Sequence, residues 1–212
     1  MDRYETAWAG NHGKDYAERC KVEAKDRIDI FNKLLNKIQI KNYPSSSILE
    51  IGCNKGHNLE AIKTALDKIQ IINNYIIQGI DINRRLCTKP NIINGSIYEL
   101  PWVDNTFEVT LTSGVLIHIP PPRLKEALFQ MRSVSNRYTI MIEYNAEKEV
   151  GTKYGIDFNY MDGVWARPYG KIYKKKFPKD KLISTGKISD LGSDGWGFSK
   201  CDYWIFEKQQ EK

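Results

Sequence analysis

A short apolar run followed by a glycine-bracketed turn and a helical pattern is the feature that most constrains the fold. Ile48-Leu49-Glu50-Ile51 predicts a buried strand, and Gly52 and Gly56 bracket the turn that follows it. From about His57 to Ile69, apolar residues recur at helical spacing. Glycines let a backbone approach a ligand closely, and a helix N-terminus presents unpaired N–H groups. The segment therefore predicts a ligand-binding turn at one end of a sheet.

Two common uses of such a turn do not fit these residues. A phosphate loop needs Lys and Ser or Thr after its last glycine, whereas Gly56 is followed by His57 and Asn58. A dinucleotide-binding loop needs a third glycine near Leu59, and none is present. The turn alone therefore leaves the ligand open.

Carboxylates accompany the turn. Asp81 ends the next predicted strand, Tyr75–Asp81, where a carboxylate can accept both hydroxyls of a ribose. A solvated acid is the alternative for Asp81, and we favour ribose recognition because the glycine turn lies at the right distance. Glu50 lies inside an apolar strand, where a charge is costly without partners. We expect Glu50 to brace the turn, to orient an amino group of the ligand, or to do both.

The rest of the chain continues the alternation of strands and helices. Such alternation predicts a parallel sheet with right-handed crossovers. Two final extended runs around a glycine-rich turn predict an antiparallel hairpin at one side of that sheet. In chain order, the further predicted elements are a weak strand at Ile92-Ile93, a strand over Phe107–Thr112, a helix over Arg123–Ser133, a strand over Tyr138–Tyr144, and hairpin runs over Leu182–Leu191 and Lys200–Glu207.

We expect one domain over residues 1–212, because 212 residues suit one core and no linker or repeat interrupts them. Residues 1–42 are predicted to form an arm and a helix that cap the ligand, with a helical apolar pattern running from Asp15 to Ile40. Residues 145–181 have no clear period and are predicted to be an irregular, substrate-side segment.

Composition narrows the setting. Four cysteines and three histidines are widely scattered, so neither a metal site nor a disulfide scaffold is expected. No apolar run approaches the ~20 residues of a membrane helix, and the first residues do not resemble a signal peptide, so we expect a cytoplasmic protein without a membrane partner. The net charge of +6 favours an anionic small-molecule substrate without establishing nucleic-acid binding. A monomer and a homodimer both remain open.

Several motifs together resemble class I S-adenosylmethionine-dependent methyltransferases. Glu50-Ile51-Gly52-Cys53-Asn54-Lys55-Gly56 with Gly79-Ile80-Asp81-Ile82 resembles their first motif and the acid after it. Residues 94–101, 104–109 and 113–119 are similar to their adenine loop, fourth strand and methyl-transfer segment. The resemblance implies a Rossmann-like α/β fold with a seven-stranded, mostly parallel sheet and a C-terminal antiparallel hairpin strand. It also implies S-adenosylmethionine as cofactor and S-adenosylhomocysteine as product.

The same resemblance implies roles by position. The turn would approach the methionine and ribose, Asp81 would hold the ribose, and Arg19 would pair with the cofactor carboxylate. Many relatives have an acid where this chain has Ser96. The implied cofactor-binding residues are Trp8, Tyr16, Arg19, Glu50, Gly52, Cys53, Gly56, Asp81, Ile82, Ser96, Ile97, Ser113 and Gly114. For Trp8, simple packing under the arm is an almost equal alternative.

A narrower resemblance covers nearly the whole chain. Residues 8–16, 114–119 and 135–138, with Glu143-Tyr144, are similar to methylases associated with pseudaminic acid biosynthesis. This implies methylation, at nitrogen, of a nonulosonic-acid-type sugar or its nucleotide-activated form. Residues 157–176 depart from that family, with only Arg167 and Tyr169 resembling its basic segment.

Three residues are candidates for the chemistry, and three for the substrate. His118 follows the fourth strand and is predicted to act as a base or orienter, with a hydrogen-bonded structural histidine as the equal alternative. Glu143 and Tyr144 are predicted to contact the acceptor. Arg167, Tyr169 and Lys171 are predicted to bind substrate. The lysine run that starts at Lys171 fits a solvated face, an anionic sugar site or a nucleic-acid track, in that order.

Two other functions compete with sugar methylation. RNA or DNA methylation is disfavoured, because Ile119-Pro120-Pro121-Pro122 lacks the residues typical of enzymes that methylate base amino groups. A non-catalytic binding protein with the same fold is disfavoured by the intact glycine turn and Asp81.

Overall fold

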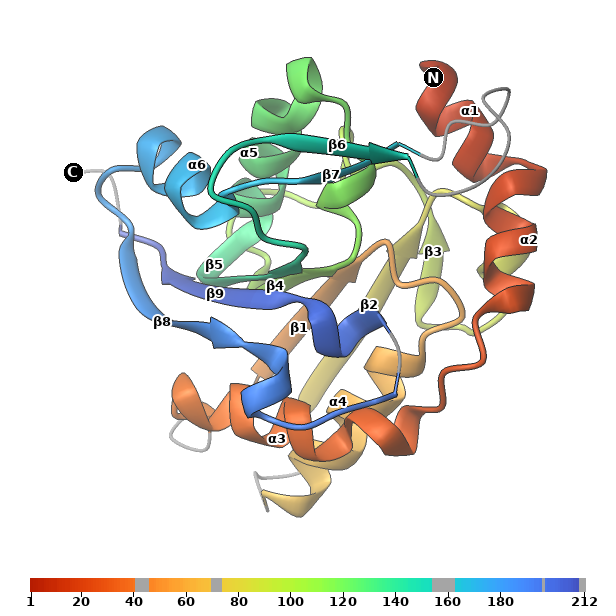
Figure 1. Ribbon diagram of the computed structural model, residues 1–212. Coiled ribbons are helices and arrows are strands. Elements are labelled where there is room, and N and C mark those ends of the chain that lie inside the picture. The colour runs from red at the N-terminus through yellow and green to blue at the C-terminus, as the bar shows by residue number, and fades with distance from the viewer. Residues whose placement is uncertain (41–45, 70–73, 154–162, 196, 210–212) are drawn as a thin grey trace.

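The computed structural model describes residues 1–40, 46–69, 74–153, 163–195 and 197–209. Its centre is a seven-stranded sheet in the order β3-β2-β1-β4-β5-β9-β8 (Figure 1). The first five strands in this order are parallel, and β9 runs antiparallel to both β5 and β8. The predicted mostly parallel sheet with a reversed C-terminal strand is confirmed. The seven strands are β1 (Ser46–Ile51), β2 (Tyr75–Asp81), β3 (Ile92–Asn94), β4 (Phe107–Ser113), β5 (Ser135–Glu143), β8 (Lys181–Lys187) and β9 (Asp202–Glu207).

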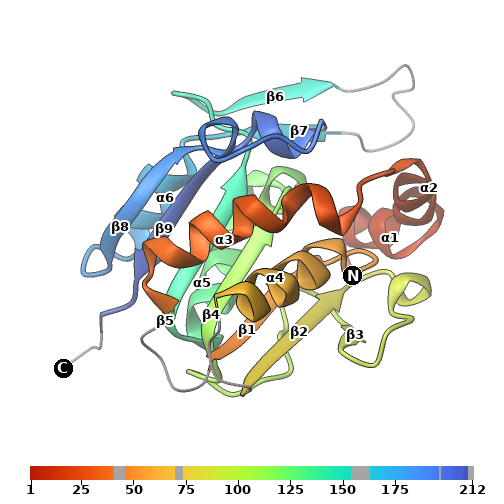
Figure 2. The ribbon, with the colours of Figure 1, turned by 90° about the horizontal axis from the view of Figure 1, so that it is seen from below.

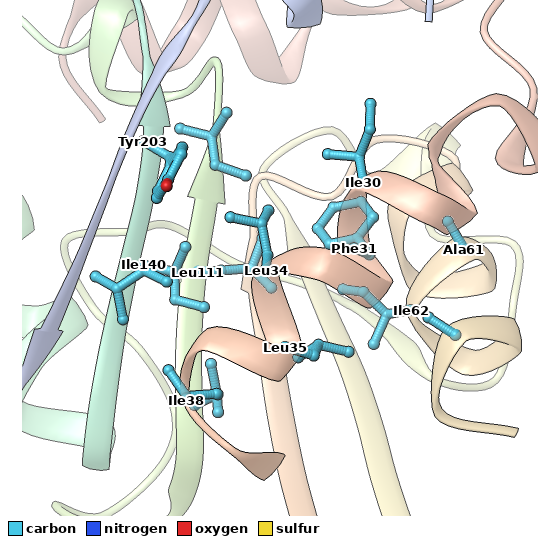
Figure 3. Close-up of a cluster of buried hydrophobic side chains, with 14 of the residues drawn as sticks. Ile30, Phe31, Leu34, Leu35, Ile38, Ala61, Ile62, Leu111, Ile140 and Tyr203 are labelled. Atoms are coloured by element: carbon cyan, nitrogen blue, oxygen red, sulfur yellow. The ribbon is translucent and has the colours of Figure 1, made fainter. Parts of the chain in front are cut away.

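Helices cover both faces of this sheet (Figure 2). Successive strand residues point to opposite faces, so Ile48 packs into one core and Leu49 into the other. The first core lies under α3 (Ile28–Lys37) and α4 (His57–Lys68), and Figure 3 shows Phe31 and Leu34 of α3 packing toward Leu111 and Ile140 of the sheet. The second core lies under α5 (Leu124–Val134) and α6 (Tyr169–Lys176).

The N-terminal helical pattern is interrupted, which differs from the prediction. Helix α1 (Arg3–Ala9) and helix α2 (Asn11–Arg19) lie at the edge of the sheet, apart from α3. Between α2 and α3 the chain is non-helical up to a short 3-10 turn over Ala24–Arg27. Apolar residues keep helical spacing across the break, so their pattern does not reveal it. The break directs Arg27 toward Asp194, to which it donates two hydrogen bonds.

The expectation of an irregular segment over residues 145–181 is wrong for much of its length. It contains β6 (Val150–Lys153) and β7 (Gly163–Ala166), which form a separate antiparallel pair, followed by α6. Helix α6 buries Tyr169 and Tyr173, four residues apart, and exposes Lys171. Because lysines surround these two tyrosines, the apolar spacing in this segment is weak, and the sequence pattern does not predict the helix. Residues 154–162 of the predicted substrate segment lie outside the described residues.

The remaining described turns are short 3-10 helices at strand and helix ends. They are Arg84–Leu86, Leu116–His118, Pro121–Arg123, Ile188–Asp190 and Gly197–Lys200. Within the described ranges, no helix is both long enough and apolar enough to cross a membrane.

Candidate functional site

A cavity of about 450 Å³ lies at the carboxyl ends of β1, β2 and β4. In open α/β sheets with parallel strands this edge is where ligands bind. The turn after β1, the loops after β2, β3 and β4, and the arm helices α1 and α2 all contribute to its wall. Of the predicted site residues, the wall contains Trp8, Tyr16, Glu50, Gly52, Cys53, Asp81, Ile82, Ser96, Ile97, Ser113, Gly114, His118 and Tyr144.

The glycine turn is shaped by close packing against a neighbouring loop. Gly52 has a φ of 73°, a conformation that side chains disfavour. A Cβ atom there would lie 2.4 Å from Cγ2 of Val115, in the loop after β4. The N–H of Gly52 donates to the carbonyl of Ile80 at 2.7 Å, which ties the turn to β2. The glycine therefore lets three strand ends converge at the cavity.

Gly56, which was predicted to bind the cofactor, lies at the start of α4. It has a φ of 80° and directly precedes α4, and a Cβ atom there would lie 2.8 Å from Cδ1 of Ile92. It is not among the wall residues. Gly56 therefore starts the helix that presents His57 and Asn58 to the cavity.

Asp81 is fixed in the cavity wall by backbone donors. Its Oδ2 accepts the N–H of Asn54 at 2.8 Å, and its Oδ1 accepts the N–H of Asn83 at 2.8 Å. Burial raises the pKa of Asp81, while these two hydrogen bonds oppose the rise. Each carboxylate oxygen has a second lone pair, so Asp81 can accept two further hydrogen bonds from a ligand.

Glu50 is a buried carboxylate of which only one oxygen is hydrogen-bonded by described residues. Its side chain lies in the wall although the residue is only 1% exposed. The Nδ2 group of Asn58 donates to Oε1 at 2.6 Å, whereas Oε2 is buried and has no hydrogen-bond partner among the described residues. Burial raises its pKa to about 7. Because buried polar atoms are normally paired, a ligand that brings an N–H donor to Oε2 would complete this site.

Arg27 is a cation beside this carboxylate that sequence reasoning missed, and both residues bind Asn58. Arg27 lies in the wall, donates from Nη1 to Oδ1 of Asn58 at 2.7 Å, and binds Asp194 at 2.7 Å. The predicted Arg19 is exposed at the end of α2 and is not a wall residue. Only the break between α2 and α3 places Arg27 here, and the helical pattern of the sequence carries no sign of that break.

The arm helices close one side of the cavity. Trp8 packs its ring against His118 with centroids 4.3 Å apart, and against Tyr16 at 5.3 Å. The Nδ2 group of Asn83 donates to the carbonyls of Trp8 and Gly10 at 3.0 and 2.9 Å. Asn83 follows Asp81 by two residues, so the arm is tied to the same loop that holds Asp81.

The loop after β3 meets an acid from the arm. Ile82, Ser96 and Ile97, which were predicted to bind the cofactor, lie in the wall. Ser96 Oγ donates to Oε1 of Glu5 at 2.5 Å. Glu5 is also a wall residue, and the sequence analysis did not select it. Its only sequence signal is the capping box that it forms with Asp2.

Glu143 does not reach the cavity, in contrast to the predicted acceptor contact. It is fully buried, and its Oε1 accepts the N–H groups of Val115 and Leu116 at 3.3 and 3.2 Å. Its Oε2 accepts the N–H of Ile117 at 3.3 Å. Burial raises the pKa of Glu143 to about 7. Glu143 therefore holds the loop that carries His118 rather than a ligand.

The three predicted substrate-binding residues are not in the cavity wall either. Arg167 has a fully buried side chain, donates to the carbonyls of Leu116 and Ile119 at 3.3 and 2.9 Å, and pairs with Glu149 at 2.6 Å. Tyr169 is buried, and its hydroxyl donates to the carbonyl of Trp165. Lys171 lies on the exposed face of α6. The first two residues brace the loop after β4 and the strand β7.

Among the described residues, no group of histidine, cysteine, aspartate and glutamate side chains is arranged to hold a metal ion. The four cysteines are free thiols.

Comparison with solved structures identifies the fold. The 1,6-didemethyltoxoflavin-N1-methyltransferase of Burkholderia thailandensis, with bound 1,6-didemethyltoxoflavin and S-adenosylhomocysteine, has a TM-score of 0.64 at 8% identity over 97% of this chain and 85% of that one. The magnesium protoporphyrin IX methyltransferase of Synechocystis PCC 6803, with bound S-adenosylmethionine, has a TM-score of 0.62 at 12% identity over 99% of both chains. No protein-family model and no curated protein sequence matches this chain.

A third solved structure, the [4+2]-cyclase SpnF, has a TM-score of 0.55 at 12% identity, covering 84% of this chain and 80% of that one. The chain thus has the Rossmann-like fold of class I methyltransferases. Identities this low establish the fold alone, and the cyclase illustrates that one fold serves different reactions.

Proposed function

We propose that this protein is an S-adenosylmethionine-dependent methyltransferase. One observation carries the proposal: Glu50 and Asp81, at the ends of neighbouring strands, face one cavity beside the glycine turn. Asp81 suits the two hydroxyls of a ribose, and Oε2 of Glu50, which no described residue hydrogen-bonds, suits an ammonium group. Arg27 lies close enough to Glu50 to share Asn58 with it, which suits the carboxylate of an amino acid. Together these groups complement the ribose and methionine parts of the cofactor.

Bound S-adenosylmethionine would supply an electrophilic methyl group, which an acceptor nitrogen or oxygen takes by in-line displacement. The chain's own contribution is to position the acceptor and exclude water. His118 and Tyr144 line the cavity beside Ser113 and Gly114, and the ring of Trp8 holds the imidazole of His118 from one side. We assign His118 the role of accepting or orienting the acceptor's proton, and Tyr144 the role of an acceptor contact.

The acceptor that we propose is a small acidic sugar of the nonulosonic type, or its nucleotide-activated form, methylated at nitrogen. Three observations support it: the resemblance to methylases associated with pseudaminic acid biosynthesis, the net charge of +6, and a cavity closed on one side by the arm. Small-molecule cavities of ~300–1,000 Å³ are typical. Glu143, Arg167 and Tyr169 brace the loop after β4 and strand β7 and do not line the cavity. We therefore assign the contacts with the sugar to His118 and Tyr144.

The deciding experiment has two parts, carried out with the full chain. Calorimetric titration with S-adenosylhomocysteine tests the cofactor site, and we expect saturable binding. Mass spectrometry of CMP-activated nonulosonic acids and their precursors, after incubation with S-adenosylmethionine, tests the acceptor. A gain of one methyl mass with turnover supports both parts.

Two other results would change the proposal in different ways. Binding without any methyl gain on these sugars discards the acceptor, and the same assay with RNA and DNA then tests nucleic-acid methylation. Absence of S-adenosylhomocysteine binding would overturn the methyltransferase assignment itself.

A further inference from the structure

Glu5 is a nearly buried carboxylate of helix α1 that lies in the cavity wall. The residue is 9% exposed, and it lies beside the loop that follows β3. It reaches the cavity from a part of the chain that contributes no strand to the sheet. An acid held in a cavity wall is costly to desolvate, so its partners reveal what it is held for.

Protein groups fix Glu5 without using up its capacity to accept hydrogen bonds. Its Oε2 accepts the N–H of Asp2 at 3.1 Å and lies 3.3 Å from Nη1 of Arg123. The guanidinium of Arg123 in turn lies over the ring of Tyr98, 3.3 Å from its centroid. Arg123 is therefore held between an aromatic face and the carboxylates of the arm, and it keeps Glu5 in one position.

Ser96, the wall residue next to Glu5, is a weaker hydrogen-bond acceptor than this carboxylate. Its hydroxyl donates to Oε1 of Glu5 at 2.5 Å and accepts the N–H of Tyr98 at 3.1 Å. The hydroxyl proton is thus already used. One lone pair remains on Ser96 Oγ and one on Oε1 of Glu5, and the charged carboxylate is the stronger acceptor of the two.

The order of the strands shows where Glu5 lies relative to Glu50 and Asp81 along the sheet edge. Glu50 lies on β1, Asp81 ends the adjacent β2, and Asn94 of β3 pairs with Asp81, two residues before Ser96. The three acceptors Glu50, Asp81 and Glu5 therefore follow one another across the sheet edge. A ligand with its ammonium at Glu50 and its ribose at Asp81 would present its base next to Ser96 and Glu5.

We propose that Glu5 recognises the exocyclic amino group of the cofactor's adenine, so that the arm helix α1 selects the base. This inference rests on the proposed function. Ile82 and Ile97 would flank the base, and the amino group would donate to the carboxylate. Because Glu5 belongs to the arm, the contact that selects the base would also hold the arm over the cavity.

The test compares two nucleosides that differ at a single group. S-adenosylhomocysteine has an amino group at the purine 6-position, and its hypoxanthine analogue, S-inosylhomocysteine, has a carbonyl oxygen there. Two acceptors would face each other when the analogue binds, so we expect wild type to prefer the adenine form about 10- to 100-fold by calorimetry. In Glu5→Gln, whose amide can donate to a carbonyl, we expect this preference to fall to near unity or to reverse.

Glu126→Gln is the matched control. Glu126 also pairs with Arg123, at 2.9 Å, but it is half exposed and outside the cavity wall. We expect it to keep the wild-type preference. If Glu5 had only a structural role, Glu5→Gln would weaken the binding of both nucleosides by the same factor. That result would overturn the inference. Equal affinities of the wild-type protein for the two nucleosides would also overturn the inference. If the wild-type protein bound neither nucleoside, the result would contradict the proposed function instead.

Discussion

The two halves of the cavity use charged side chains in opposite ways. In the half built on β1 and β2, Glu50 and Asp81 face the cavity. In the half built on β4 and β5, Glu143 and Arg167 turn away from it and bind the backbone of the loop after β4. All four residues are buried or nearly so, and all four lie at or next to the end of a strand. Residue type and position alone therefore do not decide which acid serves a ligand.

The backbone of each loop explains the difference. In the turn after β1, Gly52 and Cys53 donate to the carbonyl of Ile80, and Gly56 donates to that of Cys53. Most N–H groups of the turn are thereby paired with backbone carbonyls, and Asp81 accepts only one of them, that of Asn54. One lone pair on each oxygen of Asp81 therefore stays available to a ligand. The loop after β4 instead directs the N–H groups of residues 115–117 at Glu143. Buried backbone groups must be paired, so that carboxylate is committed to the loop.

Removing Glu143 should have the largest effect, and on stability. Glu143→Ala leaves three N–H groups without their acceptor, so we expect the free energy of unfolding to fall by about 3 to 5 kcal/mol in urea titrations. Glu147→Ala, at an exposed acid just after β5, should change it by less than about 0.5 kcal/mol. If Glu143→Ala lowered the free energy of unfolding only slightly, Glu143 would not be the acid that stabilises the loop after β4, and the two halves of the cavity would not differ in this way.

His118 is the wall residue of the second half to which we assign chemistry. We expect His118→Ala to slow methyl transfer about 100-fold while leaving the affinity for S-adenosylhomocysteine unchanged, because general acid–base groups contribute at least this much. His12→Ala is a close control, since His12 also packs on Trp8, at 4.7 Å, yet is not a wall residue. Normal turnover in His118→Ala would make this histidine structural.

Asp81 should act on affinity rather than on stability. Asp81→Ala is expected to weaken S-adenosylhomocysteine binding by well over tenfold, since a charge-assisted hydrogen bond contributes ~1.5–3 kcal/mol. Calorimetry measures the change, and the exposed Asp67→Ala on α4 serves as control. Unchanged affinity would remove Asp81 from the ribose role and leave it as a brace for Asn54 and Asn83.

The smallest expected effect concerns Glu50 and pH. Its pKa in the folded protein is raised from 4.5 to about 7, so the carboxylate form that binds an ammonium group is gained as pH rises through about 7. Below that pH we expect affinity for S-adenosylhomocysteine to fall about tenfold per pH unit. Calorimetry at a series of pH values should show this dependence in wild type and lose it in Glu50→Gln.

The same shift has a defined sign for stability. Between pH 4.5 and about 7 the folded protein holds this proton more tightly than the unfolded chain does. The contribution of Glu50 to the free energy of unfolding therefore decreases as pH rises through that window and levels off above it. If Glu50→Gln kept the wild-type slope in both titrations, Glu50 would not be the titrating group.

The predictable parts of the molecule are those that local rules determine. The strand before Gly52, helix α4 and the strand ending at Asp81 follow from apolar period and glycine placement, and the structure confirms them. Thirteen of the nineteen site residues chosen from the sequence lie in the cavity wall, because loops at one edge of a parallel sheet meet there.

The rest depends on contacts between distant segments. Glu5 meets Ser96 across 91 positions, and Arg27 meets Asp194 across 167. Nothing near Glu5 in the sequence distinguishes it from other acids of a first helical turn. Arg167 likewise acquires its role from carbonyls 48 and 51 residues away. Such roles come from tertiary packing, which patterns of a few residues do not encode.

The position of β9 has a consequence for how the chain folds during synthesis. Strand β9 begins at Asp202, yet it lies between β5, which ends at Glu143, and β8. The outer edge of β5 has no partner in the sheet until β9 has been made, although the parallel strands before it are already complete. An unpaired edge on a strand with an apolar sequence such as Ile140-Met141-Ile142 favours association with other chains. Nascent chains that stop between β5 and β9 should therefore be the ones that most need a chaperone.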